Sequence, residues 1–139
     1  METVETAEWK NRERRAAAER RAAAFAALPD AAAQLVAHFH QSVHLPRGAV
    51  VSGYWPLPGE LDIRPLMHQI HEAGHRIALP VVRAKGQPLT FRHWTPGAPL
   101  IQGAFNVMTP PESAPDREPQ VLLVPLLAFD QAGYRLGYG

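Results

Sequence analysis

Alanine, arginine and glutamate dominate the beginning of the chain, and no glycine or proline occurs before Pro29. Because these residues lose little side-chain freedom in a helix, the sequence predicts a long helix over residues 5–28 that ends at Pro29. Asp30 is a candidate N-cap for a second helix over residues 31–43. The apolar stripe of this second helix consists of Leu35, Val36 and Phe39.

Short apolar runs bounded by glycine or proline follow the two helices. Residues 48–54 and 76–82 are rich in β-branched residues and predict two buried strands. Between them, Asp62 is a candidate cap and Gly74 a candidate stop for a helix with one apolar face. A strand, a helix and a strand in this order predict parallel pairing with a right-handed crossover.

The remaining pattern completes a sheet. Residues 89–94 alternate and predict a strand with one wetter face, and residues 121–124 predict another buried strand. The proline-rich residues 95–119 predict an extended loop. We therefore expect an α/β fold of three layers, α/β/α, with a mostly parallel sheet preceded by the two N-terminal helices. The length of 139 residues indicates a single domain over residues 1–139.

Composition narrows the class of protein. Fourteen basic against 13 acidic residues give a net charge of +1, which argues against a nucleic-acid partner. The longest uncharged apolar run is far shorter than the ~20 residues of a membrane-spanning helix, so no membrane partner is expected. The chain has no cysteine and begins with acidic residues rather than a signal peptide, so we expect a cytoplasmic protein.

Candidate anion-binding groups lie at both ends of the chain. Residues 131–139 follow the last predicted strand and combine three glycines with Arg135, which suits a phosphate-binding loop but also an ordinary turn. Lys10, Arg14 and Arg21 share one face of the first predicted helix and could contact a polyphosphate. The alternative is a solvated face held by pairs such as Glu8 with Arg12.

The segment after the first predicted strand offers groups for a flat heterocycle. Tyr54 and Trp55 are aromatic, and the Glu60 carboxylate could accept hydrogen bonds from ring N–H groups. Asp62 serves better as a helix cap, and Trp94 is either a second aromatic wall or a core residue.

The seven histidines raise the question of a metal site. His71 and His75 have helical spacing, as have His40 and His44. We expect no metal site in this chain, because Gly74 should end the helix before His75 and no cysteine supplements the set. A Gly-x-Ser-x-Gly turn for acyl hydrolysis is also absent from the sequence.

Several segments together resemble the 5-formyltetrahydrofolate cyclo-ligase family. They are Lys10-x-x-x-Arg14, residues 54–62, 79–81 and 103–107, and above all residues 124–139. The resemblance implies a ligase of one-carbon metabolism that uses ATP and Mg²⁺ to convert 5-formyltetrahydrofolate to 5,10-methenyltetrahydrofolate, with release of ADP and phosphate. It also implies an enzyme with a small-molecule substrate that works as a monomer.

The resemblance implies roles for particular residues. The ATP-binding set is Lys10, Arg14, Arg135, Leu136, Gly137, Tyr138 and Gly139. Trp55 and Glu60 would contact the folate.

The chain departs from the family pattern at Glu13, which replaces an apolar residue, and at Asn106 and Thr109, which replace Gly and Glu. Family members continue beyond this point into a Tyr-Tyr-Asp-Arg segment that helps bind magnesium. We therefore expect a domain truncated at its C-terminus, with the last elements of the family fold missing and little activity from these residues alone. A non-catalytic relative that binds folate or a nucleotide is the alternative.

Overall fold

The computed structural model describes residues 2–137. The described residues fall into two compact units, one of residues 2–29 with 124–137 and the other of residues 30–123. Among the described residues, no single helix is long and apolar enough to cross a membrane, and only the two N-terminal helices taken together reach that length and composition.

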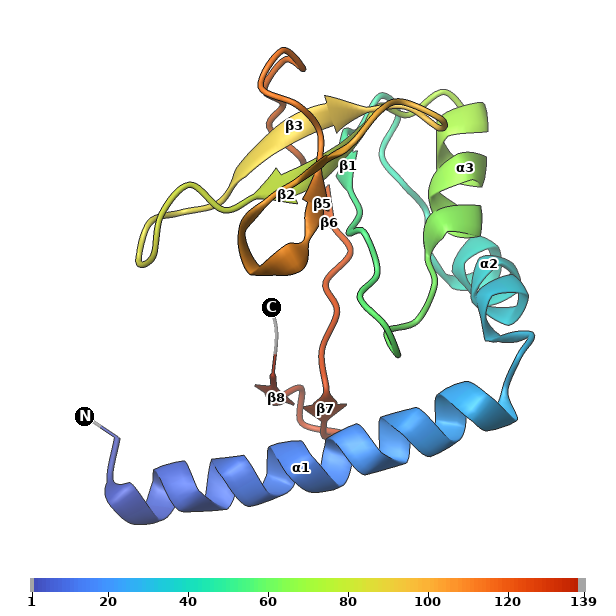
Figure 1. Ribbon diagram of the computed structural model, residues 1–139. Coiled ribbons are helices and arrows are strands. Elements are labelled where there is room, and N and C mark those ends of the chain that lie inside the picture. The colour runs from blue at the N-terminus through green and yellow to red at the C-terminus, as the bar shows by residue number, and fades with distance from the viewer. Residues whose placement is uncertain (1, 138–139) are drawn as a thin grey trace. The chain divides into compact units, whose positions relative to one another are not determined.

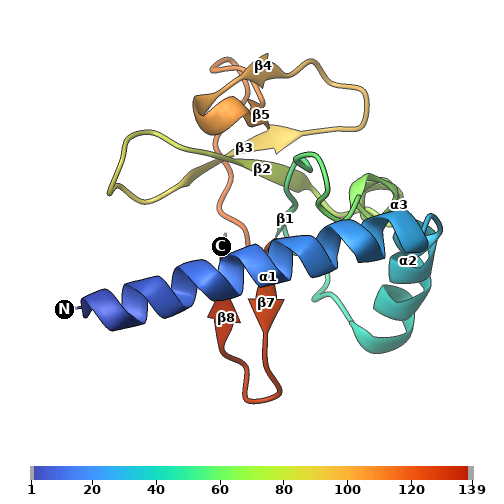
Figure 2. The same ribbon diagram turned by 60° about the horizontal axis from the view of Figure 1, so that its bottom comes forward.

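The first unit consists of a long helix and a β-hairpin. Helix α1 covers Val4–Ala27 and begins at Thr3, whose hydroxyl accepts a hydrogen bond from the N–H of Thr6 at 3.2 Å. Strands β7 (Ala128–Phe129) and β8 (Arg135–Leu136) pair antiparallel. Both views in Figures 1 and 2 place this hairpin beside the middle of α1. The helix is solvated almost all round, and Ala17 is its only buried residue.

The second unit is built on a four-stranded sheet (Figure 1). Its strands are β1 (Val51–Ser52), β2 (Ile77–Val81), β3 (Thr90–Trp94) and β6 (Val121–Leu122), in the order β3-β2-β1-β6. Val51 of β1 pairs in parallel with Ile77 on one side and Val121 on the other, while β3 pairs antiparallel with β2. The α/β class and the mostly parallel sheet are confirmed.

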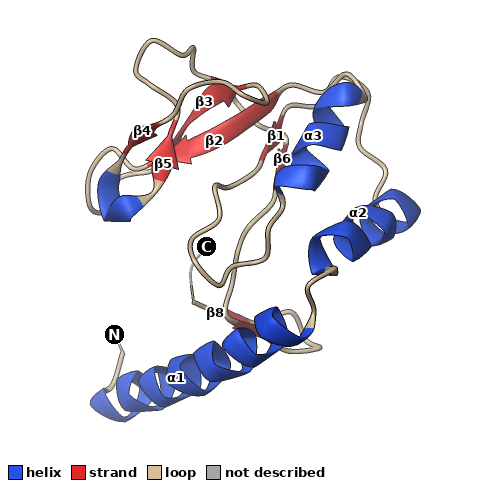
Figure 3. Cartoon of the chain, turned by 45° about the vertical axis from the view of Figure 1, so that its right-hand side comes forward, coloured by secondary structure: helices blue, strands red, loops and turns tan. Residues whose placement is uncertain are grey.

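Helices α2 (Ala31–Ser42) and α3 (Arg64–Glu72) lie side by side and supply the core of this unit (Figure 3). The buried apolar face of α3 packs against β2 and consists of Leu66, Met67 and Ile70. Gly74 ends the helix as expected, because its φ of 98° lets its N–H donate to the carbonyl oxygen of His71.

Close packing also explains a glycine between β1 and α3. A Cβ atom on Gly53 would lie 2.1 Å from Sδ of Met67, which is fully buried. Only glycine fits there without displacing the core.

Residues 95–119 are more structured than expected. They contain β4 (Ile101–Gln102), the short 3₁₀ helix η1 (Ala104–Asn106) and β5 (Met108–Thr109), and β4 pairs antiparallel with β5. Within η1, Phe105 and Asn106 have φ values of 57° and 59°. Asparagine tolerates this left-handed region better than most residues, which suits Asn106 to this position.

Other expectations need correction. Strands β1 and β6 are each only two residues long, although hydrogen bonds such as that from the N–H of Gly53 to the carbonyl oxygen of Ala78 continue beyond them. The side chain of Asp30 makes no capping hydrogen bond to α2. Helix α3 begins after Ile63 rather than after Asp62, although Asp62 accepts a hydrogen bond from the N–H of Arg64 at 3.0 Å. The third layer and the single-domain organisation stay predictions.

Candidate functional site

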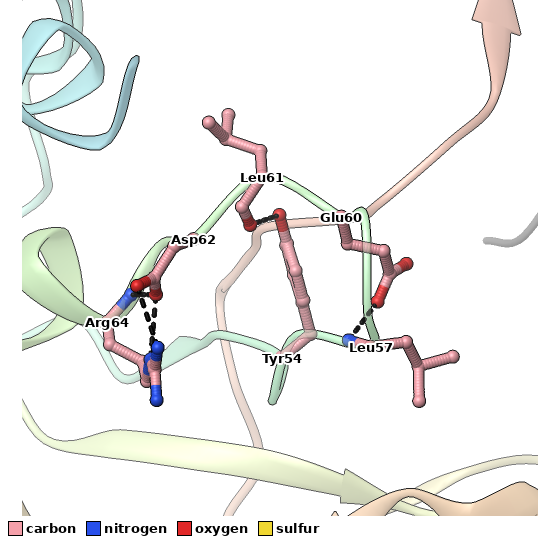
Figure 4. A network of polar contacts seen from close by, with 6 residues as sticks. All are labelled: Tyr54, Leu57, Glu60, Leu61, Asp62 and Arg64. Atoms are coloured by element: carbon pink, nitrogen blue, oxygen red, sulfur yellow. Dashed lines mark hydrogen bonds and ion pairs between the residues drawn. The ribbon is translucent and has the colours of Figure 1, made fainter. Parts of the chain in front are cut away.

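The loop between β1 and α3 is held closed by two hydrogen bonds (Figure 4). The hydroxyl of Tyr54 donates to the carbonyl oxygen of Leu61 at 2.8 Å. The N–H of Leu57 donates to Oε1 of Glu60 at 2.7 Å. These contacts join the two ends of the loop, so its side chains start from a fixed backbone.

Glu60 has a carboxylate that is only partly satisfied. Its side chain is buried, with the residue 7% exposed, and Oε1 is occupied by the N–H of Leu57. No residue within 2–137 donates to Oε2, which Figure 4 shows without a partner. Oε2 is not among the buried side-chain atoms that lack a partner in the described residues, so this acceptor can be reached from outside and is suited to the N–H group of a ligand.

Tyr54, near the start of this loop, is buried and has a neutral phenol side chain. Burial, followed by the nearby charges of Glu60 and Asp62, raises the pKa of Tyr54 to about 12. Its proton therefore stays in place at neutral pH and keeps the hydrogen bond to Leu61.

Trp55 is half buried at the mouth of the same loop, and its ring has two neighbours. Its ring centroid lies 6.0 Å from that of Trp94 in an edge-to-face arrangement, and the guanidinium carbon of Arg64 lies 5.4 Å from the Trp55 centroid. Trp94 also meets His68 edge to face at 6.1 Å. Trp94 is 3% exposed, and its Nε1 has no hydrogen-bond partner within residues 2–137. It is both a core residue and a neighbour of Trp55.

Asp62 and Arg64 form a bidentate ion pair (Figure 4). Nε of Arg64 donates to Oδ1 of Asp62 at 2.8 Å, and one terminal nitrogen donates to Oδ2 at 2.9 Å. The hydrogen bonds from Arg64 hold the pKa of Asp62 below its usual range, and the same pairing raises the pKa of Arg64. Both groups are therefore charged throughout the physiological range.

The candidate phosphate ligands on α1 already have partners. Nζ of Lys10 lies 2.7 Å from the Glu2 carboxylate, and Arg14 donates to the side-chain oxygen of Asn11 at 3.2 Å. The alternative of a solvated face named a pair between Glu8 and Arg12, which does not occur among the ion pairs of residues 2–137. The continuous helix does place Lys10 and Arg14 on one face, as the spacing predicts.

The glycine-rich end is a hairpin rather than an open loop. Arg135 and Leu136 are strand residues, and the turn before them is closed by Asp130, which accepts from the N–H groups of Gly133 and Tyr134 at 3.2 and 3.0 Å. These two N–H groups are therefore already used within the turn.

Gly137 follows the second strand with a φ of 94°, and a Cβ atom there would lie 2.8 Å from Cβ of Leu127. The need for glycine thus has a structural cause as well as any role toward phosphate. Tyr138 and Gly139, the last two predicted ATP ligands, lie outside the described residues.

The candidate residues fall into two sets. Lys10, Arg14 and Arg135 belong to the first unit, whereas Trp55 and Glu60 belong to the second. Trp55 and Glu60 lie on one loop of the second unit, whereas Lys10, Arg14 and Arg135 belong to the other unit. Over the described part of the chain, no three His, Asp or Glu side chains gather as a metal site would require.

A pocket of about 400 Å³ lies elsewhere in the second unit. It contains none of the predicted site residues, and no pattern in the sequence indicated it. Its walls are formed by Leu89, Thr90, Phe91, Asp116, Arg117, Glu118, Pro119 and Leu122.

Sequence reasoning also missed Arg64. The available signal was the spacing Asp62-x-Arg64 at a helix start, which lets an arginine turn back onto the preceding carboxylate. The stacking of the same guanidinium on Trp55 has no signal in the sequence, because it depends on the path of the loop.

The order of strands and helices, with a buried carboxylate and an aromatic ring at the carboxyl end of β1, defines an α/β protein with a candidate ligand-binding loop at a strand end. The sequence model of the 5-formyltetrahydrofolate cyclo-ligase family matches residues 6–139. The chain belongs to this family.

Relatives of known name agree with that assignment. The chain is 35% identical over 94 residues to the 5-formyltetrahydrofolate cyclo-ligase of Escherichia coli K12, covering 64% of this chain and 52% of the relative. It is 36% identical over 100 residues to the Mycolicibacterium smegmatis enzyme of the same name, covering 66% and 51%. The chain thus spans about half the length of the curated relatives it matches.

The fold has a counterpart of known structure. The NMR structure of Aquifex aeolicus 5,10-methenyltetrahydrofolate synthetase superposes with a TM-score of 0.74 over 94% of this chain and 67% of that one. The sequences are 24% identical, so this match supports the fold.

Proposed function

We propose that the protein acts on 5-formyltetrahydrofolate in one-carbon metabolism, as an ATP-dependent ligase that forms 5,10-methenyltetrahydrofolate with release of ADP and phosphate. The observation that carries the proposal is Glu60, which is 7% exposed and whose carboxylate keeps one oxygen open on the same loop as Trp55, in a chain of this family. We further propose a cytoplasmic monomer without nucleic-acid or membrane partners.

The loop after β1 would bind the folate. Oε2 of Glu60 would accept a hydrogen bond from the amino-pyrimidine part of the ring system, while the Leu57 N–H holds Oε1 in place. Trp55 would contact the ring face, because a large planar side chain buries flat ligands well. Burial around the carboxylate strengthens that hydrogen bond relative to water.

ATP supplies the phosphoryl group that makes the formyl oxygen a leaving group. The cations of Lys10, Arg14 and Arg135 suit the charge of its phosphates. Gly137 has a left-handed φ of 94° and no side chain, so a phosphate can approach its backbone closely. Leu136, Tyr138 and Gly139 complete the proposed ATP set. The residues of the described chain do not form a Mg²⁺ site, so no step is assigned to the metal.

Binding measurements test the proposal directly. We expect titration calorimetry of the 139-residue chain, with each ligand alone, to show binding of 5-formyltetrahydrofolate and weaker binding of ATP·Mg, since the described residues form no Mg²⁺ site. Glu60→Gln keeps the volume and removes the charge, so we expect the folate Kd to rise about tenfold or more, as for loss of a charge-assisted hydrogen bond. Glu72→Gln, on the exposed side of α3, is the matched control and should bind folate like the wild type.

Two outcomes would contradict the proposal. Absence of folate binding by the wild-type chain would refute the substrate class. Binding of folate without ATP·Mg would favour the alternative of a non-catalytic, folate-binding relative. A spectrophotometric assay for methenyltetrahydrofolate then separates binding from turnover.

A further inference from the structure

Arg64 stands between a carboxylate and an aromatic ring. Its planar guanidinium forms two parallel hydrogen bonds to Asp62, at 2.8 and 2.9 Å. A third contact joins the Arg64 N–H to Oδ1 of Asp62 at 3.0 Å. A fork geometry of this kind fixes the orientation of the guanidinium plane as well as its position, which a lysine ammonium could not do.

The fixed guanidinium lies against Trp55. Its central carbon is 5.4 Å from the ring centroid, within the range of a cation–π contact. The edge-to-face contact with buried Trp94 supports the same ring from another direction. Trp55 is thus held by two neighbours while remaining partly exposed, as a binding wall must be.

The anchor of this arrangement is the start of a helix. Arg64 is the first residue of α3, and the buried face of that helix packs on β2. Through this guanidinium, Trp55 contacts a helix that packs on the sheet, in addition to its own loop. Because Trp55 and Glu60 lie on the same loop, the orientation of the indole affects whether a flat ring can touch both.

We propose that Arg64, fixed by Asp62, is a positioning residue that orients the Trp55 indole to receive the flat ring system of the ligand bound by Glu60. The inference rests on the proposed function for the identity of that ligand. Arg64 itself acts through Trp55, so its effect should appear in the state of the indole before any ligand is added.

Fluorine NMR of the 139-residue chain labelled with 5-fluorotryptophan measures that state. The chain has three tryptophans, so Trp→Phe variants assign the signals, and Trp9 on α1 serves as an internal reference. In Arg64→Gln we expect the Trp55 signal to shift and broaden, while the Trp9 signal stays unchanged. Arg64→Lys keeps the charge but not the fork, and should resemble Arg64→Gln.

Two further variants sharpen the design. Asp62→Asn keeps Arg64 but removes the charge that anchors it, and should broaden the same signal to a smaller extent. Arg83→Gln is the matched control, because its pair with Asp116 is long, at 3.9 Å, and exposed. The Arg64 and Asp62 variants should fold, since these side chains are 48% and 34% exposed.

The same variants are then titrated with 5-formyltetrahydrofolate. We expect the Kd of Arg64→Gln to rise about tenfold, with the affinity for ATP·Mg unchanged. A Trp55 signal identical to wild type in Arg64→Gln would overturn the inference, and so would a moved signal with an unchanged folate Kd. Failure of the wild-type chain to bind folate refutes the proposed function instead, and the ligand-free Trp55 signal still decides whether Arg64 orients the indole.

Discussion

The two units of this protein offer candidate ligand groups on very different foundations. In residues 30–123, Trp55 and Glu60 lie on a loop whose neighbours include fully buried core residues of β2 and α3. In the other unit, Lys10 and Arg14 project from a helix in which only Ala17, 2% exposed, is buried. The first set is preorganised by a core, whereas the second is held by local polar contacts that water weakens.

The largest contrast should appear when buried and exposed apolar groups are truncated. Ile70→Ala removes a side chain from the core of the second unit and should lower the free energy of unfolding by about 2–5 kcal/mol. Phe25→Ala, on exposed α1, should change it by less than about 0.5 kcal/mol. Urea denaturation followed by circular dichroism measures both. Equal losses would show that α1 is as firmly packed as the core.

Alkaline pH tests how much the buried Tyr54 phenol contributes to the stability of the loop that carries Glu60. Because the unfolded chain ionises Tyr54 at pH 10 and the folded chain only at about 12, the stability contributed by the neutral phenol is complete below pH 10 and is lost as pH rises to 12. The loss should approach about 3 kcal/mol in urea midpoints taken across that range. Tyr54→Phe should remove this part of the pH dependence, and Tyr134→Phe, an exposed control, should retain it.

Gly137 should show that the unit containing α1 and the hairpin also has a closely packed position. Gly137→Ala combines a left-handed φ with a close approach to Leu127, so the hairpin should lose about 1–2 kcal/mol. Gly133→Ala has a similar φ of 90° but open space around it and should cost less. Amide hydrogen exchange in β7 and β8 compares the two. Equal protection in both variants would mean that the contact with Leu127 is unimportant.

The smallest effect on stability should come from Lys10. Its ion pair with Glu2 joins side chains that are 37% and 46% exposed, so Lys10→Ala should change the free energy of unfolding by less than about 0.5 kcal/mol. Under the proposed function, the same variant should weaken ATP binding about tenfold in calorimetry. Arg12→Ala is the matched control, since residues two apart do not share a helix face. A large loss of stability in Lys10→Ala would instead assign this lysine a structural role.

The sequence predicted those elements whose ends depend on neighbouring residues along the chain. The absence of glycine and proline before Pro29 predicted α1 to within a residue at each end, and Gly74 marked the end of α3. The parallel pairing of β1 with β2 followed from the order of elements.

What the sequence could not predict depends on the path of the chain in space. The sequence of residues 131–139 left a phosphate-binding loop and an ordinary turn open, and the turn is what the hairpin contains. The short strands β7 and β8 carry no clear alternation, and their turn is closed by the side chain of Asp130. In the candidate site, the residue types of Trp55 and Glu60 indicated a binding loop. The open oxygen of Glu60 and the stacking of Arg64 required the folded backbone.

Gly53 and Met67 have a consequence for how this family varies. Since the side chain of Met67 fills the volume that a Cβ on Gly53 would need, the two positions share one fixed space. A larger residue at the first position is compatible with the fold only beside a smaller one at the second. Aligned relatives should therefore show the two positions changing together, with their summed side-chain volume nearly constant.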